Sequence, residues 1–374
     1  MQPNVFLGVL YHAFGAFAAA SCYTPQKKTR LWSWEVYWIA QASFAWLILP
    51  ILGAVVTIPD YFGVLAATDP SVMLRSFLLG MLYGIGGLTF GLGIRYIGFS
   101  LNYAIAIGIS ACLGTLAPLV WDPNDGFVWQ LKEKFSSGAG MIVLAGIILS
   151  LVGIMFCGWA GALRERSSGD ASRFSFKIGV PLAVLAGVLS AVFNFSLKAG
   201  QPLAAAAAAA GASPLLKMNA IYPFSHGGAW VTNVLWCLVL VRRNRTGGEF
   251  FRLPQRDGGG SLSFYYLMAL VSGAFWYFQF FFYGMGNSQL GTAYEFTSWA
   301  LHMAMLILFS NVYGWLFREW VGASKTPKRV LHLGMAIIVG AVLVITYGNY
   351  LGKDQGTPAA DAETPATAAQ ELAE

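Results

Sequence analysis

Glu295 and His302 are the residues whose types and spacing most clearly suggest chemistry. They lie seven residues apart in an otherwise apolar stretch, Ala293 to Phe317. Seven residues make two helical turns, so both side chains should share one face, about 10 Å apart along the axis. Ionisable side chains inside an apolar helix are costly and typically serve ion or substrate handling. We therefore expect this pair to exchange a proton in the physiological range.

Glu295 also has a simpler interpretation, in which it is a hydrated residue at the start of the helix, stabilised by the helix dipole. The choice depends on where the helix begins, and both interpretations stay open at this point. His12 and His226 lie within other apolar stretches. A single histidine in such a stretch is often only hydrogen-bonded to neighbouring backbone, whereas His302 has a carboxylate predicted on its face.

The composition indicates a protein that is embedded in a lipid bilayer. Of the 374 residues, 57% are hydrophobic and only 11% are charged. Soluble domains carry about 25% charged residues. The net charge of +6 does not indicate a nucleic-acid partner, because the basic residues occupy short loops between apolar segments. The N-terminus has no basic region or cleavage site of the signal-peptide kind, so the first apolar segment is expected to be a retained span.

Ten apolar segments are long enough, or nearly so, to cross about 30 Å of hydrocarbon as helices. This predicts an all-α integral membrane fold. The predicted spans are 4–22, 36–58, 73–93, 98–120, 139–160, 176–197, 219–241, 262–286, 293–317 and 329–349. The third and fourth spans are predicted to meet in a tight hairpin over 94–97, with Arg95 at the turn.

The distribution of basic residues predicts the orientation. The loops after odd-numbered spans hold seventeen of the 23 lysines and arginines. Cytoplasmic loops are enriched in these residues, so both termini are expected outside, in the periplasm of a bacterium. Ten spans also divide into two inverted halves of five, predicted as residues 1–170 and 171–350. Residues 351–374 form an acidic, alanine-rich tail that is expected to be disordered.

Three local features give further predictions. The connection over 199–218 contains seven alanines and is expected to form a short outer helix that serves as a surface spacer. Gly80 and Gly84 are spaced for close helix packing. Glu35, beside two tryptophans at the inner end of the second span, is expected to form a salt bridge with Lys27, Lys28 or Arg30.

An aromatic face with one amide predicts a sugar site in the eighth span. Trp276, Gln279, Phe280 and Tyr283 share a face at helical spacing. Sugars stack their apolar C–H faces on aromatic rings while amides fix their hydroxyls. Aromatic stripes more often serve packing, but an amide in the middle of a membrane needs a partner. Other polar candidates within spans are Asn102 and Asn194.

Several function classes have no support in the sequence. There is no HExxH, GxSxG or Walker motif. The four cysteines, Cys22, Cys112, Cys157 and Cys237, lack metal-ligand spacing. We therefore expect no enzyme activity, no bound metal and no cofactor.

Several runs resemble one transporter family. They are Tyr23–Lys28, Trp32–Glu35, Gly91–Gly98, Ala104–Ile109, Gly114–Leu116, Trp276–Tyr283 and Ser298–Met303. With these runs the chain resembles the L-rhamnose–proton symporters of the drug/metabolite transporter superfamily. The resemblance extends from the first span to the ninth.

The resemblance implies uptake of L-rhamnose, a 6-deoxy sugar, with a proton across a bacterial inner membrane. Gln279, Trp299 and His302 are the implied site residues, and we add Trp276, Asn102 and His12 as candidate substrate contacts. Glu295 and His302 are the candidates for proton coupling. The sequence leaves open the exact sugar and whether sodium replaces the proton.

Two other functions are possible on the sequence alone. One is a metabolite or drug exporter of the wider superfamily, which a directional transport assay separates from an importer. The other is a membrane-embedded enzyme or sensor. That function needs a metal or nucleophile cluster in the spans, or a soluble output domain, and no loop here is long enough for such a domain.

Overall fold

A computed structural model describes residues 3–167, 175–253, 261–291, 294–318 and 320–352. Ten of the described helices are long and apolar enough to cross a membrane, which confirms the ten predicted spans. The predicted division between the halves, at residues 170 and 171, lies outside the described residues. The predicted tail also lies outside them from residue 353 on.

The first half contains the first five spans and their connections. In chain order its elements are α1 (Val5–Ser21), α2 (Trp34–Ala42), a π-helical segment η2 (Ser43–Ile48), α3 (Leu49–Thr57), α4 (Tyr61–Ala67), α5 (Pro70–Ile97), α6 (Phe99–Leu116), β1 (Trp121–Asp122), β2 (Gly126–Phe127), α7 (Leu131–Phe135) and α8 (Gly138–Ser167). The two short strands pair antiparallel. Segments α2, η2 and α3 together form the second span.

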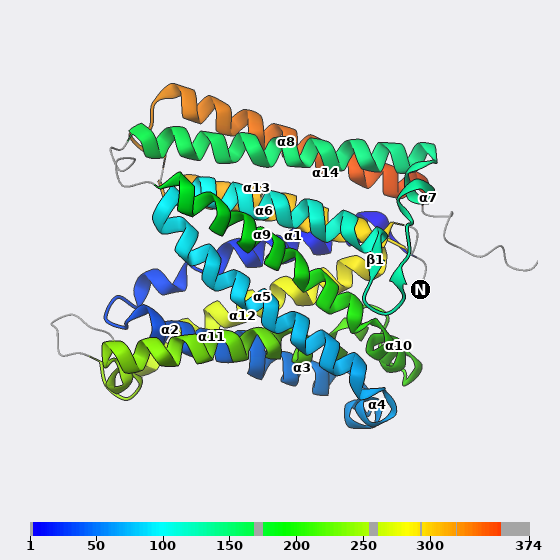
Figure 1. Ribbon diagram of the computed structural model, residues 1–374, viewed down its shortest axis with the longest axis horizontal. Coiled ribbons are helices and arrows are strands. Elements are labelled where there is room, and N and C mark those ends of the chain that lie inside the picture. The colour runs from blue at the N-terminus through cyan, green and yellow to red at the C-terminus, as the bar shows by residue number, and fades with distance from the viewer. Residues whose placement is uncertain (1–2, 168–174, 254–260, 292–293, 319, 353–374) are drawn as a thin grey trace, which may run out of the picture.

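The second half contains the remaining five spans. Its elements are α9 (Phe176–Ala199), α10 (Gln201–Ala209), α11 (Tyr222–Asn244), α12 (Leu262–Gln289), a 3-10 turn η7 (Glu295–Thr297), α13 (Ser298–Leu316) and α14 (Lys325–Gly352). Figure 1 shows these helices running alongside those of the first half, with α4, α10 and β1 gathered at one end.

The helices of the two halves interlock rather than forming separate bundles. Helix α1 packs on α12 and α13, whereas α9 packs on α5 and α6. Helix α2 packs on α11, and α8 on α14. The α8–α14 pair lies along one side of the molecule in Figure 1. Each of these principal contacts joins a helix of one half to a helix of the other.

Glycines bring α8 and α14 into close contact. A Cβ atom added at Gly153 of α8 would lie 2.6 Å from Ile338 Cγ1 of α14. In the other direction, a Cβ at Gly348 of α14 would lie 2.7 Å from Val143 Cγ2 of α8. Small residues permit this approach between membrane helices. Each helix therefore offers glycines to the branched side chains of the other.

The turn between the third and fourth spans is one residue later than predicted. Helix α5 continues through Ile97, so Arg95 lies in its last helical turn. The chain reverses at Gly98, whose φ of 77° is in the left-handed region. Glycine adopts this conformation without a steric penalty, which explains why the helix ends there.

The predicted outer helix is confirmed as α10, but its predicted role as a surface spacer is wrong. Leu203, Ala204 and Ala207 are completely buried. Leu203 and Ala207 share an apolar cluster with Val64 of α4. One face of the alanine run therefore packs against the end of the bundle, while Ala205, Ala208 and Ala209 on its other face are exposed.

The close packing predicted for Gly80 and Gly84 is confirmed, and it joins α5 to α11. A Cβ atom at Gly80 would lie 2.0 Å from the Ser225 carbonyl oxygen, and one at Gly84 would lie 2.0 Å from Thr232 Oγ1. By contrast, Gly87, one turn further along α5, has no atom within 4 Å of its added Cβ. Helix α5 therefore packs tightly on α11 at Gly80 and Gly84, while it borders open space at Gly87.

The predicted salt bridge of Glu35 is wrong, because this carboxylate instead accepts hydrogen bonds from α11 and the residues after it. Asn244 Nδ2 donates at 2.9 Å and Thr246 Oγ1 at 3.0 Å. Only 5% of Glu35 is exposed. The buried carboxylate is satisfied by neutral donors, and these bonds fasten α2 to α11.

Replacing Glu35 with alanine is expected to destabilise the protein by about 2 kcal/mol, because hydrogen bonds to a charged group contribute about 1.5–3 kcal/mol. The change should appear as a lower melting temperature of the purified protein in detergent. Replacing the exposed Glu133 with alanine is the control and should leave that temperature unchanged. Equal melting temperatures for the Glu35 variant and the unmodified protein would contradict the proposed fastening role.

Candidate functional site

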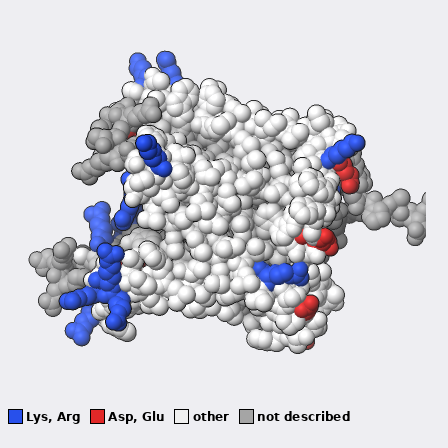
Figure 2. Space-filling model, viewed as in Figure 1, with Lys and Arg blue, Asp and Glu red and all other residues white. Residues whose placement is uncertain are grey.

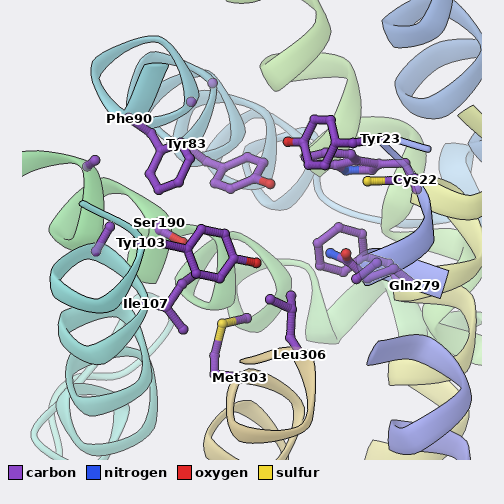
Figure 3. A pocket seen from close by; sticks show the side chains of 18 of the residues that line it. Cys22, Tyr23, Tyr83, Phe90, Tyr103, Ile107, Ser190, Gln279, Met303 and Leu306 are labelled. Carbon is purple, nitrogen blue, oxygen red and sulfur yellow. The ribbon is translucent and has the colours of Figure 1, made fainter. Parts of the chain in front are cut away.

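A cavity of ≈ 140 Å³ lies among eight of the ten spans. Its described lining comes from α1, α2, η2, α5, α6, α9, α11, α12 and α13, while none of the described residues of α8 or α14 contributes. Figure 3 shows side chains from these different helices surrounding one space. Because both halves supply walls, movement of one half against the other would change the shape of this central cavity.

Three tryptophans form one wall of the central cavity. They are Trp38 from α2, Trp46 from η2 and Trp276 from α12. The Trp46 and Trp276 rings are 5.5 Å apart at 84°. The indole nitrogens of Trp46 and Trp276 are buried and have no hydrogen-bond partner among the described residues. This wall therefore combines apolar ring surface with two available donors.

Polar groups face the same space from the other helices. Figure 3 shows the amide of Gln279 and the hydroxyls of Tyr83 and Tyr103 directed toward it. Gln279 is only 6% exposed. In the described part of the structure, its amide has no protein partner. It can therefore both donate to and accept from a bound molecule.

Trp299 is held rigidly at one side of the cavity. Its indole Nε1 donates to the Ser110 carbonyl oxygen at 3.0 Å and lies 3.2 Å from Ser110 Oγ. The ring occupies space left by Gly114, where an added Cβ would lie 2.4 Å from Trp299 Cδ1. Ser110 Oγ in turn donates to Ser190 Oγ at 3.0 Å. Fixed contacts of this kind preorganise a binding surface.

A layer of four buried aromatic residues separates the central cavity from a smaller pocket, which we call the outer pocket. The layer consists of Phe193, Phe280, Tyr283 and Trp299, each no more than 2% exposed. The Phe193 and Phe280 rings are 4.4 Å apart, and those of Tyr283 and Trp299 are 5.7 Å apart. Phe280 and Trp299 line the central cavity, whereas Tyr283 lines the outer pocket.

The outer pocket contains most of the charge near this layer. Its lining includes Glu295, Lys198, Asn194 and Asn287. Lys198 Nζ lies 3.0 Å from Asp122 Oδ2. Glu295 belongs to the 3-10 turn η7 and is exposed. Its position agrees with the interpretation of Glu295 as an entrance residue, while leaving its role in proton transfer a proposal.

His302 lies away from this pocket, beside a second histidine. Its ring is 6.1 Å from that of His12 on α1, measured between centroids. Tyr283 contacts both, with ring separations of 5.3 Å to His12 and 5.5 Å to His302. Both histidines are completely buried. They form a compact polar cluster where α1, α12 and α13 meet.

Tyr103 forms the boundary on the side of the cavity away from this layer. It lines both the central cavity and a pocket of ≈ 70 Å³, which we call the inner pocket and whose other lining includes Cys157, Arg164 and Asn311. The outer pocket, central cavity and inner pocket are therefore separated by the aromatic layer on one side and Tyr103 on the other.

Comparison with known proteins places this architecture in one family. The family described as the L-rhamnose-proton symport protein (RhaT) matches residues 1–350. The chain belongs to the L-rhamnose-proton symporter family. An L-rhamnose-proton symporter of Cronobacter sakazakii is 34% identical over 351 residues, which is 93% of this chain and 99% of that protein. One from Mannheimia succiniciproducens is 34% identical over 350 residues, with the same coverage of each chain. The family is one of membrane transporters and not of enzymes.

In this symporter-family chain, only some of the predicted site residues lie together around the central cavity. Trp276, Gln279 and Trp299 line the central cavity, but Asn102, His12 and His302 do not. Asn102 donates to the Phe90 carbonyl oxygen at 3.1 Å and joins α6 to α5. Its amide is used within the protein, which explains why it lies outside the lining.

The prediction that one continuous α-helix contains both Glu295 and His302 is wrong. Helix α13 begins at Ser298, so Glu295 belongs to the preceding 3-10 turn. The assumption of two continuous α-helical turns therefore fails. The two residues point to different surroundings, one to the outer pocket and the other to His12 and Tyr283.

Several lining residues were missed by reasoning from the sequence. The main ones are Tyr23, Trp38, Trp46, Tyr83, Tyr103, Ser190 and Asn233. Tyr83 lies between Gly80 and Gly84, and an aromatic hydroxyl among packing glycines is a usable signal. Trp46 lies in a π-helical segment, and such segments often occur at functional sites, but the sequence does not show where they form.

Proposed function

We propose that this chain imports L-rhamnose, or a related 6-deoxy sugar, together with a proton. The observation that carries the proposal is the central cavity, which combines an aromatic wall with a free buried amide between eight spans. The family match supports the same function, because the relatives from Cronobacter sakazakii and Mannheimia succiniciproducens are named L-rhamnose-proton symporters.

The composition of the cavity suits a deoxy sugar. The rings of Trp46 and Trp276 offer apolar surface to the C–H groups and to the methyl group of the sugar. Their indole N–H groups and the Gln279 amide are available for its hydroxyls. We assign Gln279, Trp276 and Trp299 as sugar contacts, and we add Tyr83 and Tyr103.

The distribution of charge supports an inner-membrane location with both termini in the periplasm. Figure 2 shows lysine and arginine crowded at one end of the molecule, and acidic residues mixed with a few basic ones at the other, with a broad uncharged band between them. In Figure 1 the N-terminus lies at the end opposite the basic cluster. Because cytoplasmic ends are enriched in basic residues, we place the basic end in the cytoplasm.

The helix contacts support two inverted halves. If the first five spans correspond in order to the last five, then α1 corresponds to α9, α5 to α12 and α6 to α13. The contacts of α1 with α12 and α13 then match those of α9 with α5 and α6. Inverted repeats of this kind place substrate sites at their interface and move by rocking. We propose residues 1–170 and 171–350 as these halves.

We propose that the aromatic layer and Tyr103 close opposite ends of the route that the sugar takes through the protein. In the described arrangement the layer is completely packed, while the cavity extends inward to Tyr23, which is 42% exposed. This arrangement corresponds to a carrier closed on the outer side. Separation of Trp299 from Phe193 would join the outer pocket to the central cavity.

Proton coupling is assigned to Glu295 and His302. Glu295 would receive the proton in the outer pocket, and His302 would hold it deeper in the membrane. Protonation would favour the outward-facing state that binds sugar. A carboxylate at the outer pocket is accessible to water in the outward-facing state, whereas the buried histidine is protected from it.

An imposed proton gradient is expected to drive accumulation of labelled L-rhamnose in vesicles that contain the purified protein. One pH unit is worth about 1.4 kcal/mol per proton, which sustains about a tenfold sugar gradient at one proton per sugar. Replacing Glu295 with glutamine, which keeps its shape but removes its charge, should reduce or abolish the accumulation. Gradient-driven accumulation by this variant at the level of the unmodified protein would refute the role of Glu295.

Two further measurements in the same vesicles separate the alternatives. Accumulation driven by a sodium gradient at equal pH on both sides would show that sodium, and not a proton, is transported with the sugar. Movement of rhamnose only outward would support an exporter. Absence of any rhamnose transport by properly folded protein, with transport of another 6-deoxy sugar, would correct the identity of the sugar.

A further inference from the structure

His12 and His302 are two buried histidines that contact each other but do not line the central cavity. Both are 0% exposed, and their ring centroids are 6.1 Å apart at an interplanar angle of 65°. All four ring nitrogens lack hydrogen-bond partners among the described residues. Buried polar groups are normally paired, so this many free nitrogens at one place point to an unoccupied binding function.

The neighbouring helices leave space for both imidazoles. A Cβ atom at Gly15 would lie 3.3 Å from His302 Cε1, and one at Gly286 would lie 2.8 Å from His12 Nε2. The ring of Tyr283 packs against each histidine. The two glycines and the tyrosine therefore form a fitted enclosure, in which the histidine rings are brought together from α1 and α13.

We propose that His12 and His302 form one proton-binding site, in which a single proton is held between the two imidazoles. The inference rests on the proposed function, and it adds His12 to the coupling machinery. The proton leaves the Glu295 carboxyl group or a water molecule and binds an imidazole nitrogen. A carboxylate or hydroxide and an imidazolium result, so charge and atoms balance.

The arrangement favours one proton rather than two. Two imidazolium ions at this separation, away from water, would repel each other strongly. When one ring is protonated, its N–H can donate to a free nitrogen of the other after rotation about the side-chain bonds. That hydrogen bond stabilises the charge in apolar surroundings. Each histidine therefore needs the other to hold the proton.

Few other ionisable groups lie near the pair. From α12, Tyr283 faces both rings. Among the described residues of α1, α13 and the helices packed around them, the other ionisable side chains are Tyr11 of α1; Tyr103 and Cys112 of α6; Cys157, Arg164 and Glu165 of α8; Tyr265, Tyr266 and Tyr277 of α12; Tyr313 of α13; and Lys325, Lys328, Arg329, His332, Tyr347 and Tyr350 of α14. No described carboxylate contacts the pair to neutralise a second proton.

The pair is connected to the sugar cavity through α13. Trp299 lies one helical turn before His302 and lines the central cavity. The Trp299 ring also contacts Tyr283 at 5.7 Å. A proton on the pair can therefore alter the position of a residue that faces the sugar, which supplies a route for coupling.

The number of protons carried per sugar is the first test. Vesicles containing the unmodified protein are clamped at zero membrane potential, and rhamnose accumulation is measured at several pH differences. A shared site predicts accumulation that rises about tenfold per pH unit, whereas two separately protonated histidines predict about a hundredfold. A hundredfold dependence would overturn the shared site.

Variants then test whether both histidines are required. His12→Gln and His302→Gln are each expected to lower gradient-driven accumulation at least tenfold and to remove the dependence of sugar exchange on pH. The double variant should be no worse than either single variant. His226→Gln is the buried control and His332→Gln the exposed control. Both should accumulate sugar normally. Normal accumulation by His12→Gln, or sugar exchange in this variant with the pH dependence of the unmodified protein, would overturn the proposal.

A measurement on the unmodified protein covers the case in which the variants do not fold. Nuclear magnetic resonance of protein labelled with ¹⁵N-histidine should show His12 and His302 titrating with one common midpoint and one proton in total. Two independent titrations would overturn the inference. If the unmodified protein transports no sugar at all, the proposed function fails. If it transports sugar and His12→Gln does so equally, only this inference fails.

Discussion

Replacing Gln279 with methionine is expected to raise the rhamnose concentration for half-maximal exchange by about tenfold to a hundredfold. The side chain keeps its length but loses a donor and an acceptor in a site with little water. Two hydrogen bonds at about 0.5–1.5 kcal/mol each account for this range. Exchange at equal pH on both sides is the suitable measurement, because it reports sugar binding without net proton movement.

Gln289 provides the matched control for this prediction. It lies on the same helix and is 2% exposed, but its Oε1 accepts a hydrogen bond from the Asn4 backbone N–H at 3.0 Å, away from the cavity. Gln289→Met should therefore leave the half-maximal concentration unchanged. An unchanged value for Gln279→Met would show that the amide does not contact the sugar, and the site would then have to be sought elsewhere.

The second large effect is expected at Gly228, where α11 crosses α5. A Cβ atom there would lie 2.0 Å from the Phe77 carbonyl oxygen and 2.6 Å from the Met81 backbone nitrogen. Both are backbone atoms, so the helices would have to separate. Gly228→Ala should destabilise the protein by about 3 kcal/mol, at the upper end of typical overpacking, even though alanine favours helix by about 1 kcal/mol.

The adjacent residue, Gly227, separates the effect of a close helix contact on stability from the effect of helix propensity. A Cβ atom at Gly227 would have an ordinary contact, 3.7 Å from Phe77 Cε2. Gly227→Ala is therefore expected to preserve or slightly raise the melting temperature in detergent. A Gly228→Ala protein that melts at or above the temperature of the unmodified protein would rule out the crossing described here.

The sequence predicted the spans well because each is a long uninterrupted apolar segment. It also singled out Trp276 and Gln279, which line the central cavity, since a single amide marks one face of an aromatic helix. It did not predict Trp38, Trp46 or Tyr83. In helices that are apolar on every side, the face that borders a cavity differs little in composition from the face that borders lipid.

The error at Glu295 has a different origin. The spacing between Glu295 and His302 implies a shared face only if one α-helix contains both, and the chain adopts a 3-10 turn before Ser298. His12 could not be joined to His302 from sequence either. The two are separated by most of the chain, and their contact depends on how α1 crosses α13.

The reciprocal glycine contacts between α8 and α14 have a consequence for biosynthesis. The ribosome completes the fifth span when little more than 40% of the chain has been made, but the principal partner of that span is the last one to emerge. Until then α8 can use only α6 from its own half, and its glycines face lipid, which fills their grooves poorly. Assembly of the first half therefore finishes only after the second half has been synthesised, and the final helix completes both.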